Sequence, residues 1–111
     1  MDNQLENIAT QVGMLRKNYA KKLSSHIEKI YYLWETLQNT WQLETLDEFY
    51  HELDNLAETS LMFEFNQLSD MTRELEYFIY PFIQLDLQPN DSQSQQVFTF
   101  IIELQRVAEQ S

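Results

Sequence analysis

The chain of 111 residues has no cysteine, one glycine and two prolines. Without cysteine it has no disulfide, no thiol nucleophile and no thiolate ligand for a metal ion. With one glycine it has no glycine-rich loop that could hold a phosphate group. The scarcity of turn-forming residues, together with a hydrophobic fraction of 43% and an aromatic fraction of 14%, predicts a protein that is almost entirely helical.

Basic residues are scarce as well, with 7 Lys and Arg against 18 Asp and Glu. Residues 1–30 contain five bases and three acids, a net charge of +2, whereas residues 31–111 contain two bases and fifteen acids, a net charge of −13. Such an acidic surface repels nucleic acids and anionic membranes, so the expected partner is another protein. No apolar run is long enough to span a bilayer and no secretion leader is recognisable, which predicts a cytoplasmic protein.

Apolar residues recur at helical spacing along the chain and predict a series of amphipathic helices. Ser25-His26-Ile27-Glu28 and Thr45-Leu46-Asp47-Glu48 fit the capping-box pattern and predict helix starts, the first of them just after a helix break. Asn66 is expected to cap a further helix, which Pro81 kinks or ends, and residues 88–93 have the composition of a loop. The apolar stripes are Leu5, Ile8, Val12, Leu15 and Tyr19; Ile27, Ile30, Leu33, Trp34 and Leu37; Leu46, Phe49, Tyr50, Leu53, Leu56, Ala57 and Ser60; Leu68, Met71, Leu75, Phe78, Ile79 and Phe82; and Val97, Phe98, Ile101, Leu104 and Ala108.

Short connections between such helices favour antiparallel neighbours. The expected fold class is therefore all-α, an antiparallel up-and-down four-helix bundle with an additional N-terminal helical segment, and residues 1–111 should form one domain. The third and fourth stripes should form the spine of the bundle. The carboxylates fall outside the stripes and are expected to face solvent, and the two histidines, His26 and His51, have no companion that would make them catalytic. The sequence thus predicts no enzyme activity, no cofactor and no metal site.

Three segments can be compared with a known family: LETLDEFYHELDNLAE (43–58), FEFNQLS (63–69) and RELE (73–76). This succession resembles the histidine-containing phosphotransfer (HPt) domain, a four-helix bundle that relays phosphate to and from receiver domains in two-component signalling. In that family the active helix carries a phosphorylatable His, an apolar residue two positions on, often Lys and Gly next, a small residue, and a second Gly near the turn. The segment YAKKLSSHIEKI (19–30) also resembles the entry into HPt domains, so the chain resembles the N-terminal part of a longer signalling protein.

Two alignments with the family are possible. With His51 at the acceptor position, the turn and Leu68-Ser69 come three residues too late. With Asp54 at that position no insertion is needed, and we prefer this alignment, although it means that the phosphate acceptor is missing. In it, Leu56 takes the apolar position, Ala57 and Glu58 take the Lys and Gly positions, Ser60 takes the small position and Glu64 takes the second Gly.

The resemblance implies a degenerate HPt-like interaction module that docks the receiver domain of a response regulator, or an adjacent domain of the same chain, without accepting its phosphate. An incoming phosphoryl group would meet carboxylates at the acceptor and glycine positions and no nearby base. The expected docking face consists of His51, Asp54, Asn55, Glu58 and Glu64.

Two alternatives stay open. His51 lies about 60° around the helix from Asp54 and would be the acceptor of an active phosphorelay domain. Otherwise the chain would be a homodimerising helical scaffold with Trp34, Trp41 and Phe100 as surface anchors.

Overall fold

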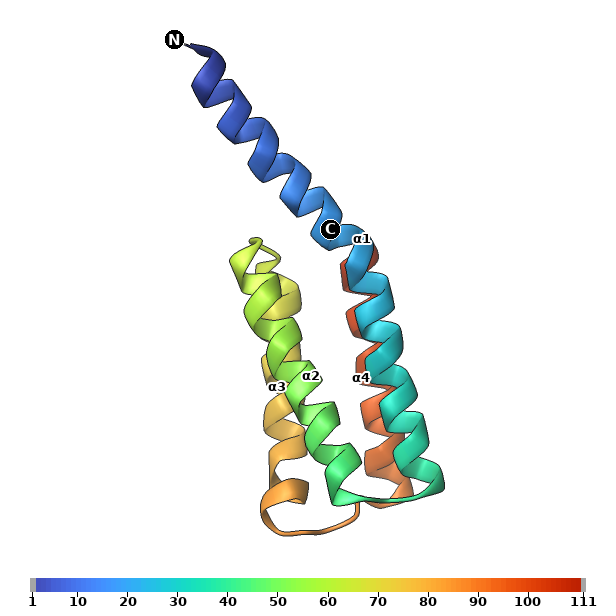
Figure 1. The fold of residues 1–111 in the computed structure, drawn as a ribbon. Helices are drawn as coiled ribbons and strands as arrows, with labels where there is room; N and C mark the ends of the chain where they lie inside the picture. Colours follow the sequence, from blue (N-terminus) through green and yellow to red (C-terminus); the bar gives the residue numbers. More distant parts are fainter. Residues whose placement is uncertain (1, 111) are drawn as a thin grey trace.

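The computed structural model describes the backbone of residues 2–110 and the side chains of residues 7–110. The chain forms four helices that run alternately up and down (Figure 1), and each helix packs against the two beside it around the bundle. The predicted all-α, up-and-down four-helix bundle is confirmed. The helices are α1 (Asp2–Asn39), α2 (Leu43–Met62), α3 (Asn66–Gln84) and α4 (Asp91–Gln110).

α1 is one continuous helix of 38 residues, so the predicted break before Ser25 is wrong. Leu23, Ile27 and Ile30 are buried on one face across that point. Burying this face favours an unbroken helix, and tertiary packing outweighs the local capping preference of Ser25 and Glu28.

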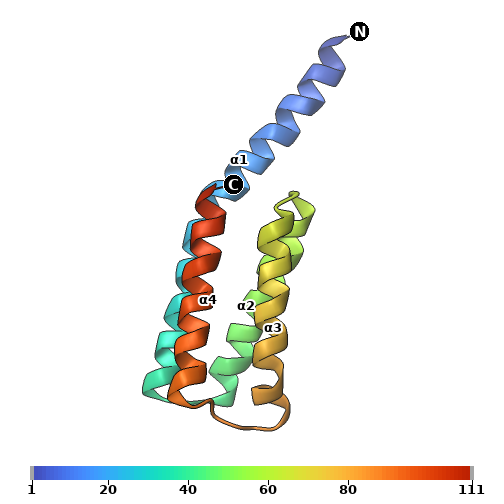
Figure 2. The ribbon, with the colours of Figure 1, turned by 180° about the vertical axis from the view of Figure 1, so that it is seen from behind.

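The first half of α1 projects beyond the bundle, as both ribbon views show (Figures 1 and 2). The predicted additional N-terminal segment is therefore part of α1 and not a separate helix. All side chains of residues 7–18, which we call the α1 extension, are exposed. The stripe residues Ile8, Val12 and Leu15 are 57%, 59% and 56% exposed and lie outside the core, whereas Tyr19 of the same stripe packs against the core.

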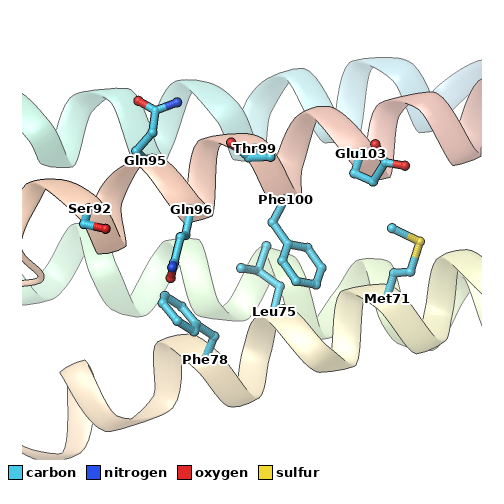
Figure 3. A pocket seen from close by; sticks show the side chains of 9 residues that line it. All are labelled: Met71, Leu75, Phe78, Ser92, Gln95, Gln96, Thr99, Phe100 and Glu103. Carbon is cyan, nitrogen blue, oxygen red and sulfur yellow. The ribbon is translucent and has the colours of Figure 1, made fainter.

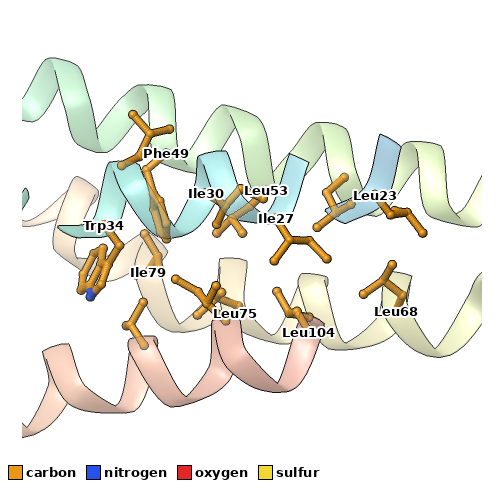
Figure 4. Close-up of a cluster of buried hydrophobic side chains, with 14 of the residues drawn as sticks. Leu23, Ile27, Ile30, Trp34, Phe49, Leu53, Leu68, Leu75, Ile79 and Leu104 are labelled. Carbon is orange, nitrogen blue, oxygen red and sulfur yellow. The ribbon is translucent and has the colours of Figure 1, made fainter. Parts of the chain in front are cut away.

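The core lies between the four helices, with α2 and α3 packed most extensively, so the predicted spine is confirmed (Figure 4). Each fully buried leucine or isoleucine stabilises the fold by about 1.5–3 kcal/mol. Trp34 is fully buried, contacts Phe49 at a ring-centroid distance of 5.1 Å, and donates a hydrogen bond from Nε1 to the Ser94 carbonyl at 3.2 Å. The prediction that Trp34 is a surface anchor is wrong, because its ring and its N–H are both used inside the bundle.

Small residues allow α2 and α3 to approach closely. Ala57, Ser60, Ser69 and Thr72 are all buried at this contact. The Ser69 hydroxyl donates across it to the Ala57 carbonyl at 2.8 Å, and Ser60 and Thr72 donate to carbonyls of their own helices. Each buried hydroxyl therefore has an acceptor, so burying it carries no desolvation penalty for an unpaired group.

The helix starts differ from those predicted. α2 begins at Leu43 after Gln42, so Thr45 lies inside the first turn and does not cap the helix. α3 begins with Asn66 itself, after Phe65. The α4 start was predicted as loop, but Asn90 and Gln93 form a reciprocal capping box, with Oδ1 of Asn90 accepting from the Gln93 N–H at 2.8 Å and Oε1 of Gln93 accepting from the Asn90 N–H at 2.9 Å.

The helix ends are built without glycine. Glu64 after α2 and Asp86 after α3 have φ of 66° and 50°, the left-handed region that glycine favours. At each end the next N–H bonds back five residues, from Phe65 to the Ser60 carbonyl and from Leu87 to the Phe82 carbonyl, as in a Schellman motif. Pro81 lies in the last turn of α3, and the helix ends three residues later at Gln84. No helix in residues 2–110 is both long and apolar enough to cross a bilayer.

Candidate functional site

Asp54, the residue aligned with the family's acceptor, lies near the middle of α2 at the edge that faces α3. Its neighbour Leu53 is fully buried, which leaves the Asp54 carboxylate at the seam between the two helices, 40% exposed. Arg73 of α3 reaches across this seam and donates a hydrogen bond from Nη1 to Asp54 Oδ1 at 2.5 Å. The expectation that no base lies near this position is therefore wrong.

Arg73 also holds Glu76, which lies one turn further along α3. Its Nη1 is 3.0 Å from both carboxylate oxygens of Glu76, whose side chain is only 7% exposed. The expectation that the acids face solvent fails for Glu76. We call Asp54, Arg73 and Glu76 the carboxylate–arginine cluster; with both carboxyls ionised it carries a net charge of −1.

The cluster perturbs the titration of its members. Burial raises the pKa of Glu76 above its ordinary value, the Arg73 guanidinium opposes this increase, and the charges of Asp54 and Glu58 add to it. The hydrogen bond to Asp54 is the main cause of the raised pKa of Arg73, so the guanidinium stays charged. The charged Arg73 side chain therefore donates hydrogen bonds to the Asp54 and Glu76 carboxylates and occupies carboxylate oxygens that would otherwise be free to react.

Tyrosines border the cluster. The rings of Tyr50 (α2) and Tyr80 (α3) lie with their centroids 6.1 Å apart, and Tyr77, one turn before Tyr80, is 78% exposed. Burial raises the pKa of Tyr50, and the nearby charges of Glu76 and Asp54 raise it further, so the phenol stays neutral at physiological pH. Arg73, Glu76, Tyr77 and Tyr80 recur at intervals of three and four residues and so share one face of α3.

The other predicted docking residues lie in two places. His51, Asn55 and Glu58 are exposed and lie on the outer surface of α2, since their spacing of four and three residues keeps them on one helix face. Glu64 is also exposed, but it lies in the turn after α2, whose last residue, Met62, is about 12 Å along the helix axis from Asp54 at 1.5 Å per residue. The structure thus brings together four of the five predicted residues and leaves Glu64 at the end of the bundle.

Arg73, Glu76 and the tyrosines were missed from the sequence as site residues. Arg73 and Glu76 belong to the RELE pattern, but nothing in the sequence shows that α3 turns them toward Asp54. We call the surface formed by His51, Asp54, Asn55, Glu58, Arg73, Tyr77 and Tyr80 the α2–α3 face.

A second polar cluster links α1 to α2. Glu52 Oε2 lies 2.8 Å from His26 Nε2, and Glu52 Oε1 accepts a hydrogen bond from Lys29 Nζ at 2.9 Å. Burial raises the pKa of Glu52, but the hydrogen bonds and charges of Lys29 and His26 outweigh burial and leave the pKa lowered. His26 and Lys29 of α1 thus share Glu52 of α2, and the contact ties the two helices together.

A metal site is not formed by the described residues. Among the residues whose side chains are placed, no group of three or more His, Asp or Glu could hold a metal ion. Glu48 and His51 have the Glu-x-x-His spacing of bundle metal sites, but both are exposed on the outer side of α2, whereas such sites face the core.

An apolar groove runs between α3 and α4, the most loosely packed pair of neighbouring helices (Figure 3). In it Leu75 and Phe100 point toward each other, so Phe100, predicted as a surface anchor, is half-buried. The only charged group in the lining, Glu103, is paired with Arg106. Apart from Glu103, the lining consists of apolar and uncharged polar side chains, as is common in sites that bind apolar groups. The groove has a volume of about 640 Å³ and is lined by Met71, Leu75, Phe78, Ser92, Gln95, Gln96, Thr99, Phe100 and Glu103.

Comparison with known proteins assigns this chain to no family. It matches no known protein-family model, no curated protein and no solved structure.

Proposed function

We propose that this chain is a degenerate HPt-like module of a cytoplasmic two-component system, which docks a receiver domain, or an adjacent domain of the same polypeptide, without accepting its phosphate. The observation that carries the proposal is the ion pair between Asp54 and Arg73, at 2.5 Å. Where the HPt family has a free imidazole, this chain has a carboxylate that is already bound to a guanidinium.

Backbone and packing support the alignment that puts Asp54 at the acceptor position. Glu64, which aligns with the second glycine of the family, has a left-handed φ of 66°, a conformation in which glycine is normally preferred. Ser60, which aligns with the small residue, is fully buried between α2 and α3. Leu68 and Ser69, which align with the Leu-Ser pattern, are both buried in the first turn of α3.

The electrostatics of the cluster oppose phosphate acceptance. A nucleophile must present a free lone pair, and the charge of the transferred group must be neutralised. Arg73 is shared between Asp54 and Glu76, so its positive charge is already offset by two carboxylates. A phosphoryl group arriving at Asp54 would also meet the carboxylate of Glu58 one turn away. Asp54 is therefore expected to stay unmodified.

The composition of the α2–α3 face suits docking. Exposed tyrosines such as Tyr77 and Tyr80 are enriched at protein interfaces, because they bury a large rigid area and still hydrogen-bond at the rim. Glu58 and the cluster make this face acidic, so a complementary partner would carry a basic patch. We expect added salt to slow association more than it speeds dissociation.

The phosphate test is intact-mass analysis after incubation with a panel of phosphorylated receiver domains at neutral pH, beside an active HPt domain as a positive control. We expect the control to gain phosphate and this chain to gain none. A phosphate adduct on His51, lost in the His51→Gln variant, would make the chain an active relay and refute the proposal.

The docking test compares two exposed tyrosines on different surfaces. Tyr77 is 78% exposed on the α2–α3 face, and Tyr32 is 64% exposed on α1. With a receiver that binds, we expect Tyr77→Ala to weaken binding by at least roughly tenfold and Tyr32→Ala to leave it unchanged. Equal effects of the two changes, or binding to no receiver in the panel, would count against docking through this face.

A further inference from the structure

The α1 extension has the apolar pattern of a coiled coil. Ile8, Val12, Leu15 and Tyr19 are separated by four, three and four residues, and Leu5 continues the pattern three residues earlier. This is the a/d spacing of a heptad repeat, with Val12 and Tyr19 at a positions and Ile8 and Leu15 at d positions. A stripe this narrow fits one partner helix.

Among the described residues, the extension contacts the bundle at its C-terminal end, and its apolar stripe is exposed. An isolated helix of this length is marginal in water, and Gly13 in its middle costs about 1 kcal/mol relative to alanine. At the C-terminal end of the extension the Arg16 guanidinium lies 4.9 Å from the Phe65 ring centroid, and just beyond the extension Tyr19 stacks on Phe63 at 4.7 Å. An apolar stripe on such a helix gains stability only by pairing.

We propose that the α1 extension is a self-association site, at which two copies of this chain pair as a short antiparallel coiled coil. The charges select both the partner and the orientation. Residues 7–22 contain four bases and no acid, whereas the first six residues contain Asp2 and Glu6 and no base. A parallel pair would place the bases of both copies side by side. An antiparallel pair brings the basic end of each helix to the acidic start of the other.

The end of the bundle limits how far the two helices overlap. Because Phe63 of the bundle stacks on Tyr19, a partner helix cannot extend along α1 as far as Tyr19. This places Ile8 of one copy beside Val12 of the other. The start of the partner helix then approaches Leu61 and Met62, which are exposed at the end of α2 next to Phe63. The seam is only about two heptads long, so pairing should be reversible and depend on concentration.

A lipid surface fits the extension less well than a second copy does. Interfacial helices have a broad apolar face with aromatic anchors, and residues 7–18 contain no aromatic residue. The acidic residues 31–111, with a net charge of −13, would also be repelled by an anionic bilayer. The pairing is independent of the proposed docking function, since it uses α1 and leaves the α2–α3 face open.

Sedimentation velocity over a range of protein concentrations tests the proposal. We expect a reversible monomer–dimer equilibrium that weakens at least roughly tenfold in the Val12→Glu, Leu15→Glu double variant. Met14 provides a matched control, because it is 58% exposed on the opposite side of the same helix. Met14→Glu should leave the equilibrium unchanged. Far-UV circular dichroism and thermal unfolding of each variant report that the bundle is intact, as expected for residues outside the core.

Cysteine cross-linking tests the orientation. Because the chain has no native cysteine, every disulfide must form between the introduced residues. Under mild oxidation, a mixture of Ile8→Cys and Val12→Cys chains should form mixed disulfide dimers, and Ile8→Cys alone should form few. Efficient cross-linking of Ile8→Cys to itself would indicate a parallel pair and overturn the proposal. A chain that stays monomeric at all concentrations, or that sediments with anionic vesicles as a monomer, would overturn it as well.

Discussion

Replacing Arg73 with methionine tests the carboxylate–arginine cluster. The change keeps a long side chain over the seam between α2 and α3 but removes the cation from Asp54 and Glu76. The two carboxylates differ in exposure, with 40% of the Asp54 side chain and 7% of the Glu76 side chain accessible. Water can replace Arg73 at Asp54, but it reaches Glu76 poorly.

The expected loss of stability follows from this difference. An exposed ion pair contributes at most about 1 kcal/mol, so the Asp54 contact adds little. Breaking a fully buried pair costs about 3–5 kcal/mol because a charge is left uncompensated. Since Arg73 is itself 38% exposed, solvent screens the pair and the cost is roughly halved. We expect Arg73→Met to lower the free energy of unfolding by about 2 kcal/mol at pH 7.

The loss should depend on pH. The pKa of Glu76 in the folded protein is already raised above its ordinary value of 4.5, mainly by burial and against the opposing effect of Arg73. A raised folded-state pKa contributes stability that is fully present below the unfolded pKa and is lost as the pH rises through the folded pKa. Without Arg73 the folded-state pKa of Glu76 rises further. The free energy of unfolding of the variant therefore falls more than that of the unmodified chain as the pH rises from 4.5 to 7. The deficit should therefore shrink on acidification.

The measurement is urea unfolding followed by far-UV circular dichroism at pH 7 and near pH 4.5. Adding Glu76→Gln to Arg73→Met should restore most of the lost stability, because the stranded charge is gone. Arg106→Met is the control: Arg106 pairs with Glu103 three residues earlier, and the two side chains are 51% and 43% exposed, so little loss is expected. A loss below about 0.5 kcal/mol at pH 7, or an equal loss at both pH values, would refute the reasoning.

Three further changes test other parts of the fold. Glu64→Gly should raise the free energy of unfolding by about 1 kcal/mol, because glycine adopts the left-handed φ of 66° without strain; an unchanged or lower melting temperature would contradict this. Glu52→Gln should destabilise the protein at pH 7, and because the folded-state pKa of Glu52 is lowered, the deficit should vanish as the pH falls well below 4.5; a deficit that persists at pH 3 would contradict the role of its contact with Lys29. Asn90→Ala should cost about 1 kcal/mol by removing the cap on Gln93, and Asn90→Ser should recover part of it, as thermal unfolding would report.

The apolar periodicity predicted most of the core correctly. The stripe from Ile27 to Leu37 is entirely buried, as are Leu46, Phe49, Leu53 and Leu56 of the stripe in α2. This works because the apolar face of an amphipathic helix, repeating every 3.6 residues, stabilises the fold when it is buried against a neighbouring helix. The same periodicity could not distinguish the α1 extension from the rest, since Ile8 and Leu15 repeat as regularly as buried residues and lie past the end of the bundle.

Local signals were less reliable at the helix boundaries. The box beginning at Ser25 lies within a continuous helix, and the one beginning at Thr45 lies inside the first turn of α2. The pair that does form a box, Asn90 with Gln93, stands in a segment that resembles loop. A capping pattern indicates only that these residues are able to cap a helix. Burial of the neighbouring apolar face decides whether a helix begins there.

The sequence by itself determined the all-α class, the antiparallel four-helix order and the acidic character of the bundle, because these depend on composition and on spacing along one helix at a time. Only the tertiary structure decided that Arg73 joins Asp54 to Glu76, and that Glu52 joins His26 to Lys29. Asp54 and Arg73 are 19 residues apart on different helices, so their contact depends on how α3 is rotated against α2. That rotation is set by close packing at small side chains such as Ser60 and Ser69, a property of the helix pair and of neither helix alone.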